Sequence, residues 1–216
     1  MEYQAPKSQC ELCLSEFAGR GMTRHMKTCL VKHFQKKGSK ATPSKLLYIH
    51  VYDPSNPDYF LHLLVSGKTS FGDLDLFLRN IWLECCGHMS AFSYRRYEDE
   101  IDMRKKVGDV LMPGVELIYQ YDFGSTTELS VRGIDIHHGA IKGRKNIQIL
   151  ARNSQPLVPC DGCGQRPATV ICTECQWGPG GWLCDACAAN HPCDEDMLLP
   201  VVNSPRTGVC GYTGDD

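Results

Sequence analysis

Several familiar signatures are missing from this 216-residue sequence. No apolar run approaches the roughly 18 residues that a membrane-spanning helix needs, so we expect no membrane contact. The polar N-terminus leaves no room for the apolar core of a secretory signal. A glycine-rich phosphate loop, a dinucleotide-binding glycine pattern and a hydrolase nucleophile elbow are absent, as are internal repeats. The expectation is a cytoplasmic globular protein outside the commonest enzyme classes.

Cysteine, by contrast, is abundant and odd in number, with 13 residues. In a reducing compartment, dense cysteines usually bind metal rather than form disulfides. Three lie within residues 1–30, eight lie within residues 160–216, and only the adjacent pair Cys85 and Cys86 falls between. This distribution predicts an ordinary central domain flanked by two zinc-stabilised modules, with boundaries at residues 1–37, 45–152 and 157–216.

Charge divides the chain at nearly the same places. Residues 1–46 carry nine Lys or Arg against three Asp or Glu, a net charge of +6. Residues 47–150 carry eleven against fourteen (−3), and residues 151–216 carry three against eight (−5). The near-neutral total of −2 therefore hides a basic head and an acidic tail, which is informative about partners.

The first 30 residues contain the spacing of one tetrahedral zinc site. Cys10-x2-Cys13 is followed by eleven residues and then by His25-x3-Cys29. The second pair lies one helical turn apart and so shares one helix face, while the first pair forms a knuckle turn. The segment resembles a zinc finger of the Cys-Cys-His-Cys type. A unit this small needs the metal to fold.

Basic side chains accompany the helix that carries His25 and Cys29. Such clustering is where affinity for nucleic acid begins, since phosphate contacts supply most of the binding. The alternative is a solvated helix face with no partner, which is what most charge runs are. The nucleic-acid candidates are Arg20, Arg24, Lys27, Lys32, Lys36 and Lys37.

The C-terminal region carries three Cys-x2-Cys pairs followed by a His-x-Cys pair, which provide ligands for two closed zinc sites. Sequential wiring leaves only eight residues between neighbouring pairs. Cross-brace wiring spans intervals of twenty and fifteen residues, which suit paired zinc knuckles better. We therefore predict one site from Cys160, Cys163, Cys184 and Cys187, and another from Cys172, Cys175, His191 and Cys193.

Residues 160–193 resemble a B-box-type zinc finger in ligand order and in the small residue before the second pair. The resemblance implies protein–protein contact and scaffolding rather than chemistry. The final His-x-Cys pair is closer than is usual in that family, so Cys210 is a rival for the eighth ligand. Its other interpretation is a partly buried thiol outside any site.

The middle of the chain predicts an α+β domain with a central antiparallel sheet and a packed helix. Residues 45–53 and 59–66 read as a hairpin, and a capping-box-like Ser70 and Asp73 begin a helix that ends at Gly87. Residues 115–123 and 128–132 read as a second hairpin, with residues 147–150 as an edge strand.

This order of elements, and above all the strand end Tyr121-Asp122-Phe123-Gly124, resembles the plasmid-borne, transposon-associated TnpR-like open-reading-frame family. The resemblance implies an early hairpin with a following helix and an association with a mobile element. It does not imply recombination, since no serine or tyrosine recombinase signature is present. Asp122 is expected to cap the turn after its strand.

Two further constellations invite chemistry. Cys85 and Cys86 near His88 suggest a thiol nucleophile, but a small buried apolar role for Cys85 is the better interpretation. Asp135, His137 and His138 offer metal ligands from a loop, without a fourth partner. We therefore predict a non-enzymatic adaptor that holds three zinc ions and binds a protein, with auxiliary nucleic-acid contact. The alternatives are a nucleic-acid-binding regulator of a mobile element and, last, an enzyme.

Overall fold

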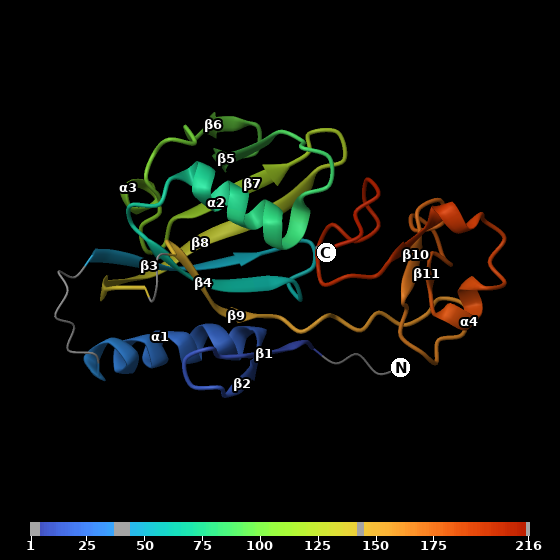
Figure 1. Ribbon diagram of the computed structural model, residues 1–216, viewed down its shortest axis with the longest axis horizontal. Coiled ribbons are helices and arrows are strands. Elements are labelled where there is room, and N and C mark those ends of the chain that lie inside the picture. The colour runs from blue at the N-terminus through green and yellow to red at the C-terminus, as the bar shows by residue number, and fades with distance from the viewer. Residues whose placement is uncertain (1–4, 37–43, 142–144, 215–216) are drawn as a thin grey trace.

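A seven-stranded antiparallel sheet forms the centre of the protein (Figure 1). The computed structural model describes residues 5–36, 44–141 and 145–214. The order of the strands across the sheet is β6-β5-β7-β8-β3-β4-β9. Their bounds are β3 Ser44–Tyr52, β4 Phe60–Ser66, β5 Ser90–Arg95, β6 Glu98–Glu100, β7 Glu116–Tyr121, β8 Thr127–Gly139 and β9 Ile147–Arg152.

The observed sheet confirms the predicted α+β class with a large antiparallel sheet. Both predicted hairpins form, β3 with β4 and β7 with β8, and β9 is an edge strand beside β4. The predicted loop around Asp135 and His137 is wrong, because β8 continues to Gly139 and pairs with β3 from Ser130 to Gly139. The register of that pairing shifts at a bulge opposite Tyr48 and Ile49, where Ile134 of β8 is the extra residue.

One face of the sheet is covered by α2 (Phe71–Leu78) and by the π-helical turn η1 (Arg79–Leu83). Ser70 and Asp73 form the capping box that the sequence predicts. The helix ends at Leu83 rather than at Gly87, which turns the chain with φ +70°. The buried side chains of α2 and η1 pack on the inward positions of the strands, and the core includes Leu74, Leu78, Trp82, Ile49, Leu63, Leu117 and Tyr119.

The opposite face is covered by α1 (Gly19–Lys36), which follows the small hairpin of β1 (Lys7–Gln9) and β2 (Glu16–Ala18). Met22, Met26 and Leu30 are fully buried against Leu46, Tyr48, Leu64 and Leu150. Alternate residues of β3 therefore face two different cores. This explains why the sequence of β3 is apolar almost without interruption.

The C-terminal module contains a three-stranded sheet in the order β11-β10-β12 and a short helix, α4 (Asp185–Ala188). Its strands are β10 Val170–Cys172, β11 Trp182–Leu183 and β12 Leu198–Pro200, and a 3₁₀ turn η2 spans Glu195–Met197. Beyond β12, residues 201–214 return to the end of the central sheet (Figure 1). We call these residues the C-terminal tail. A last short helix, α3 (Val107–Val110), lies near β3 and β4. Within the described residues, no helix combines the length and apolarity that a membrane crossing demands.

Candidate metal centres

The structure gathers cysteine and histidine side chains into groups of four that could each hold a metal ion. Within each group, the candidate ligand atoms lie within 4.8 Å of one another. Three of the groups contain the twelve ligands proposed from spacing alone, and a fourth group was not predicted. The chemistry of the donors suits zinc, which prefers thiolate sulfur and imidazole nitrogen.

The N-terminal group joins Cys10 and Cys13, in the turn of the β1–β2 hairpin, to His25 and Cys29 on α1. The Sγ atoms of Cys10 and Cys29 are 3.8 Å apart, and Cys13 Sγ lies 3.3 Å from His25 Nε2. A tetrahedral zinc ion with Zn–S of about 2.3 Å and Zn–N of about 2.0–2.1 Å has ligand separations of about 3.8 Å and about 3.6 Å. The observed distances fit that geometry.

The C-terminal module holds two groups in the cross-brace arrangement. Cys160, Cys163, Cys184 and Cys187 form one group, and Cys172, Cys175, His191 and Cys193 form the other. The sulfur separations are 3.9 Å for Cys163 with Cys184 and 3.7 Å for Cys175 with Cys193, again the edges of a zinc tetrahedron.

Cys210 does not compete for the second C-terminal group. The structure places Cys193 beside Cys175, whereas Cys210 lies beside His88 of the central domain. The alternative eighth ligand is therefore wrong. The short His-x-Cys spacing is accommodated by a bend at residues 192–193, which follows the turn at the end of α4.

Local contacts shift the pKa values of individual cysteines in the two C-terminal groups in opposite directions. Burial alone would raise the pKa of Cys160, but backbone N–H groups, including that of Cys184 at 3.2 Å, outweigh it and lower this pKa to about 6. Similar contacts lower the pKa of Cys172 to about 7. Contacts with neighbouring thiols raise the pKa of Cys187 and of Cys193 to about 12. Zinc binding at these sites is therefore expected to release protons.

The fourth group consists of Cys85, Cys86, His88 and Cys210. Cys85 follows the packed helix rather than lying on it, because η1 ends at Leu83. Its side chain is half-buried and packs against the central core, as the small apolar role predicts in part. Sequence reasoning missed this group because His88 and Cys210 are 122 residues apart. The available signal was that three of the 13 cysteines, Cys85, Cys86 and Cys210, lie outside the twelve predicted ligands. Among the residues that the structure describes, four groups, rather than the three expected, could therefore bind metal.

Next to this group the C-terminal tail places a fully buried arginine in the central domain. Arg206 Nη2 donates to Asp122 Oδ2 at 2.7 Å, and its Nη1 donates to Ser125 and Thr127. The guanidinium also lies over the ring of Tyr121, 4.8 Å from its centroid. Asp122 Oδ1 accepts from the N–H groups of the following turn, as expected for a cap. Burial opposes ionisation of Asp122, but Arg206 and these N–H groups lower its pKa.

The basic candidates line α1 in part. Arg20, Arg24 and Lys27 are exposed, and their spacing of four and three residues places them on one helix face. Lys32 is exposed as well and lies about a third of a turn away from that stripe. Lys36 is the last residue of the helix, and Lys37 lies outside the described residues. The central candidates Asp135 and His137 form a contact of 3.7 Å on β8 without joining any metal group.

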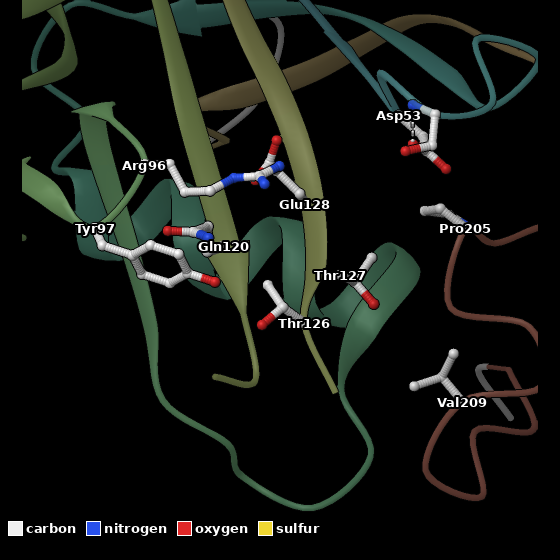
Figure 2. A pocket seen from close by; sticks show the side chains of 10 residues that line it. Asp53, Arg96, Tyr97, Gln120, Thr126, Thr127, Glu128, Pro205 and Val209 are labelled. Carbon is white, nitrogen blue, oxygen red and sulfur yellow. Dashed lines mark hydrogen bonds and ion pairs between the residues drawn. The ribbon is translucent and has the colours of Figure 1, made fainter. Parts of the chain in front are cut away.

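A polar pocket of about 300 Å³ opens between the sheet and the C-terminal tail (Figure 2). Arg96 and Glu128 pair across its floor at 2.8 Å, with Gln120 beside them, and Asp53 lies on the opposite wall. Burial raises the pKa of Asp53. Among the described residues that line this pocket there is neither histidine nor cysteine, so it lacks the parts of a thiol or histidine-assisted nucleophile.

Comparisons with known proteins leave the family open. No family model matches the chain, and no curated protein matches it. The TnpR-like and B-box resemblances therefore gain no support from these comparisons. Among solved structures, a protein of unknown function from Methanosarcina mazei Go1 is similar, with 16% identity and a TM-score of 0.43. The match covers 50% of this chain and 69% of that one, and no conclusion is drawn from it.

Proposed function

We propose that the protein is a non-enzymatic zinc-binding adaptor that presents a surface to a protein partner. The observation that carries this proposal is the composition of the metal groups. Each of the three predicted groups offers four protein ligands, which would fill the coordination shell of zinc. A catalytic zinc keeps one position for water or substrate. Closed sites instead stabilise small modules whose surfaces are then used for binding.

An exposed tryptophan marks the surface that we assign to the partner. Trp177 follows Cys175 in the C-terminal module and is 85% exposed. It lies at the rim of a cavity of about 700 Å³ that is lined by the module, the β7–β8 turn and the tail. Tryptophan is the residue type most enriched among those that dominate protein–protein binding energy. A solvent-exposed indole beside a cavity is a typical anchor for a partner side chain.

Quantitative affinity capture from cells of the source organism tests this assignment. The Trp177→Ala variant should lose partners that the unchanged protein enriches. Tyr97→Ala is the matched control, because Tyr97 is an aromatic residue of the central domain that is 64% exposed. Equal enrichment by all three proteins would contradict the proposed surface. Elemental analysis of the same preparations should return at least three zinc ions per chain.

The second proposed function is auxiliary nucleic-acid contact through the exposed stripe of Arg20, Arg24 and Lys27. The observation that favours it is that α1 carries five basic residues and no acidic residue. Contacts to phosphate would be ionic and would not depend on sequence. An alternative is that this contact serves a regulator associated with a mobile element. Only the family resemblance of residues 117–124 favours that alternative.

Titration of a labelled duplex at low and moderate salt tests this contact. Affinity should decline by about 0.9 in log K per neutralised phosphate for each tenfold increase in salt. Charge reversal of the three stripe residues should weaken binding to every sequence alike. Reversal of the exposed Arg95, Arg104 and Lys105 in the central domain is the control. If both triple variants bind like the unchanged chain, the stripe is only a solvated face.

A further inference from the structure

The fourth group brings together two segments that are far apart in sequence. Cys85, Cys86 and His88 lie in the turn after η1, and Cys210 lies in the C-terminal tail. His88 Nε2 is 3.3 Å from Cys210 Sγ, the same separation as between Cys13 and His25 in the N-terminal group. We propose that these four side chains bind a fourth zinc ion, which fastens the C-terminal tail to the central domain.

The distribution of cysteines supports this site. Three groups with three cysteines and one histidine, together with one group of four cysteines, account for all 13 cysteines of the chain. Cysteines kept only for packing are usually buried. Cys86 and Cys210 are exposed instead, although an exposed thiol gains nothing from packing. Metal binding would explain why the thiols of Cys86 and Cys210 lie close together although neither is buried.

The backbone around the group resembles that of two of the three predicted sites. The residue after Cys86 is Gly87, with φ +70°, and the residue after Cys210 is Gly211, with φ +69°. Leu14 and Gly164, which follow Cys13 and Cys163, have the same left-handed conformation with φ +63°. Cys210 itself has φ +52°, a region that cysteine disfavours. The tail therefore adopts a costly conformation at the residue whose sulfur faces the other ligands.

The charge of the surroundings fits the same assignment. A zinc ion with three thiolates and a neutral imidazole carries a net charge of −1. Arg206 is fully buried beside the group, and its guanidinium interacts electrostatically with the side chain of Cys85. Its Nε has no hydrogen-bond partner in the described part of the chain. A thiolate at Cys85 would provide that guanidinium with a negative neighbour in addition to Asp122.

The site can be tested on the full chain loaded with zinc under reducing conditions. Native mass spectrometry should show four zinc ions. Brief alkylation followed by peptide mapping should find Cys86 and Cys210 protected to the same degree as Cys163 and Cys175, and all four should be labelled after chelation. Burial cannot produce this protection, because Cys86 and Cys210 are exposed. Three zinc ions with Cys86 and Cys210 labelled, or a disulfide within the group, would overturn the fourth site.

A pair of histidine variants separates this site from the proposed function. His88→Ala should lose one zinc and increase labelling of Cys86 and Cys210 at least about tenfold, since even changes around a ligand lower metal affinity about 10–100-fold. His138→Ala, an exposed histidine outside every group, should retain four zinc ions. Identical behaviour of the two variants would overturn the site. Labelling of Cys163 or Cys175 in the zinc-loaded protein would count against the proposed adaptor sites instead.

Discussion

Replacement of Arg206 tests how the C-terminal tail is held in the central domain. The side chain has no exposed surface and makes hydrogen bonds to Asp122, Ser125 and Thr127. Arg206→Met keeps most of the volume and the apolar stem but removes the charge and every donor. Asp122 would then keep its own charge, with a side chain only 8% exposed and its cationic partner gone.

The expected cost follows from the loss of one partner of a buried pair. Removing one member of such a pair typically costs about 3–5 kcal/mol, because the other charge remains in a poorly solvated place. Two N–H groups of the following turn still donate to Asp122, so we expect the lower end, about 3 kcal/mol. Replacing both residues, in an Asp122→Asn, Arg206→Met double variant, should recover part of that loss.

Guanidinium chloride unfolding, followed by far-UV circular dichroism in excess zinc, provides the measurement. Excess zinc holds metal linkage constant among the variants. Arg104→Ala is the control, because Arg104 pairs with Asp102 at 2.6 Å but is 89% exposed, and such pairs add little to stability. A midpoint for Arg206→Met equal to that of Arg104→Ala would refute the argument that burial makes this pair important.

Three further predictions concern other parts of the fold. Burial, with repulsion from Arg132, lowers the pKa of His50 to about 4, so the folded state favours the neutral imidazole. The contribution of His50 to the free energy of unfolding is therefore complete above a pH of about 6.5, the unfolded pKa. This contribution falls by about 2 kcal/mol between pH 7 and pH 5. His50→Gln should remove that part of the acid sensitivity in paired unfolding curves at the two pH values. Met26→Ala should lower the free energy of unfolding by about 2–5 kcal/mol, because Met26 is fully buried. Val31→Ala is the control and should change that free energy little, because Val31 is exposed. Similar losses in both variants would argue against α1 covering the sheet. Ser70→Ala should cost about 1 kcal/mol through loss of the capping box, measurable as a lower thermal midpoint.

Features that short stretches of sequence determine could be predicted from the sequence alone. Apolar alternation placed both hairpins, and the pair Ser70 and Asp73 placed the start of α2. The twelve proposed zinc ligands come in pairs that are two to four residues apart, and each pair forms within one turn or one helix face. Because these determinants are local, the sequence alone carries them.

Features that depend on distant contacts were not predictable. Nothing in residues 85–88 indicates that the chain returns to them at Cys210. The apolar face of α1 is visible in the sequence, but its partners Leu46 and Leu64 lie beyond a linker of undetermined direction. The strand β5 was missed because its outer half, ending at Tyr94 and Arg95, is exposed and lacks an apolar face.

The C-terminal module begins and ends at almost the same point of the central domain. Asn153 Nδ2 donates to Asn203 Oδ1 at 2.7 Å, and Asn203 Nδ2 donates to the backbone oxygen of Asn153 at 2.8 Å. The chain thus leaves and re-enters the central domain at adjacent residues, so the C-terminal module is an insertion in that domain rather than a terminal extension of it. Cutting the chain at residue 157 would also discard Arg206 and Cys210, so a simple truncation confounds two losses. Bridging residues 153 and 203 with a short turn would remove the C-terminal module alone. Another double-zinc unit with closely spaced ends could be inserted at the same place.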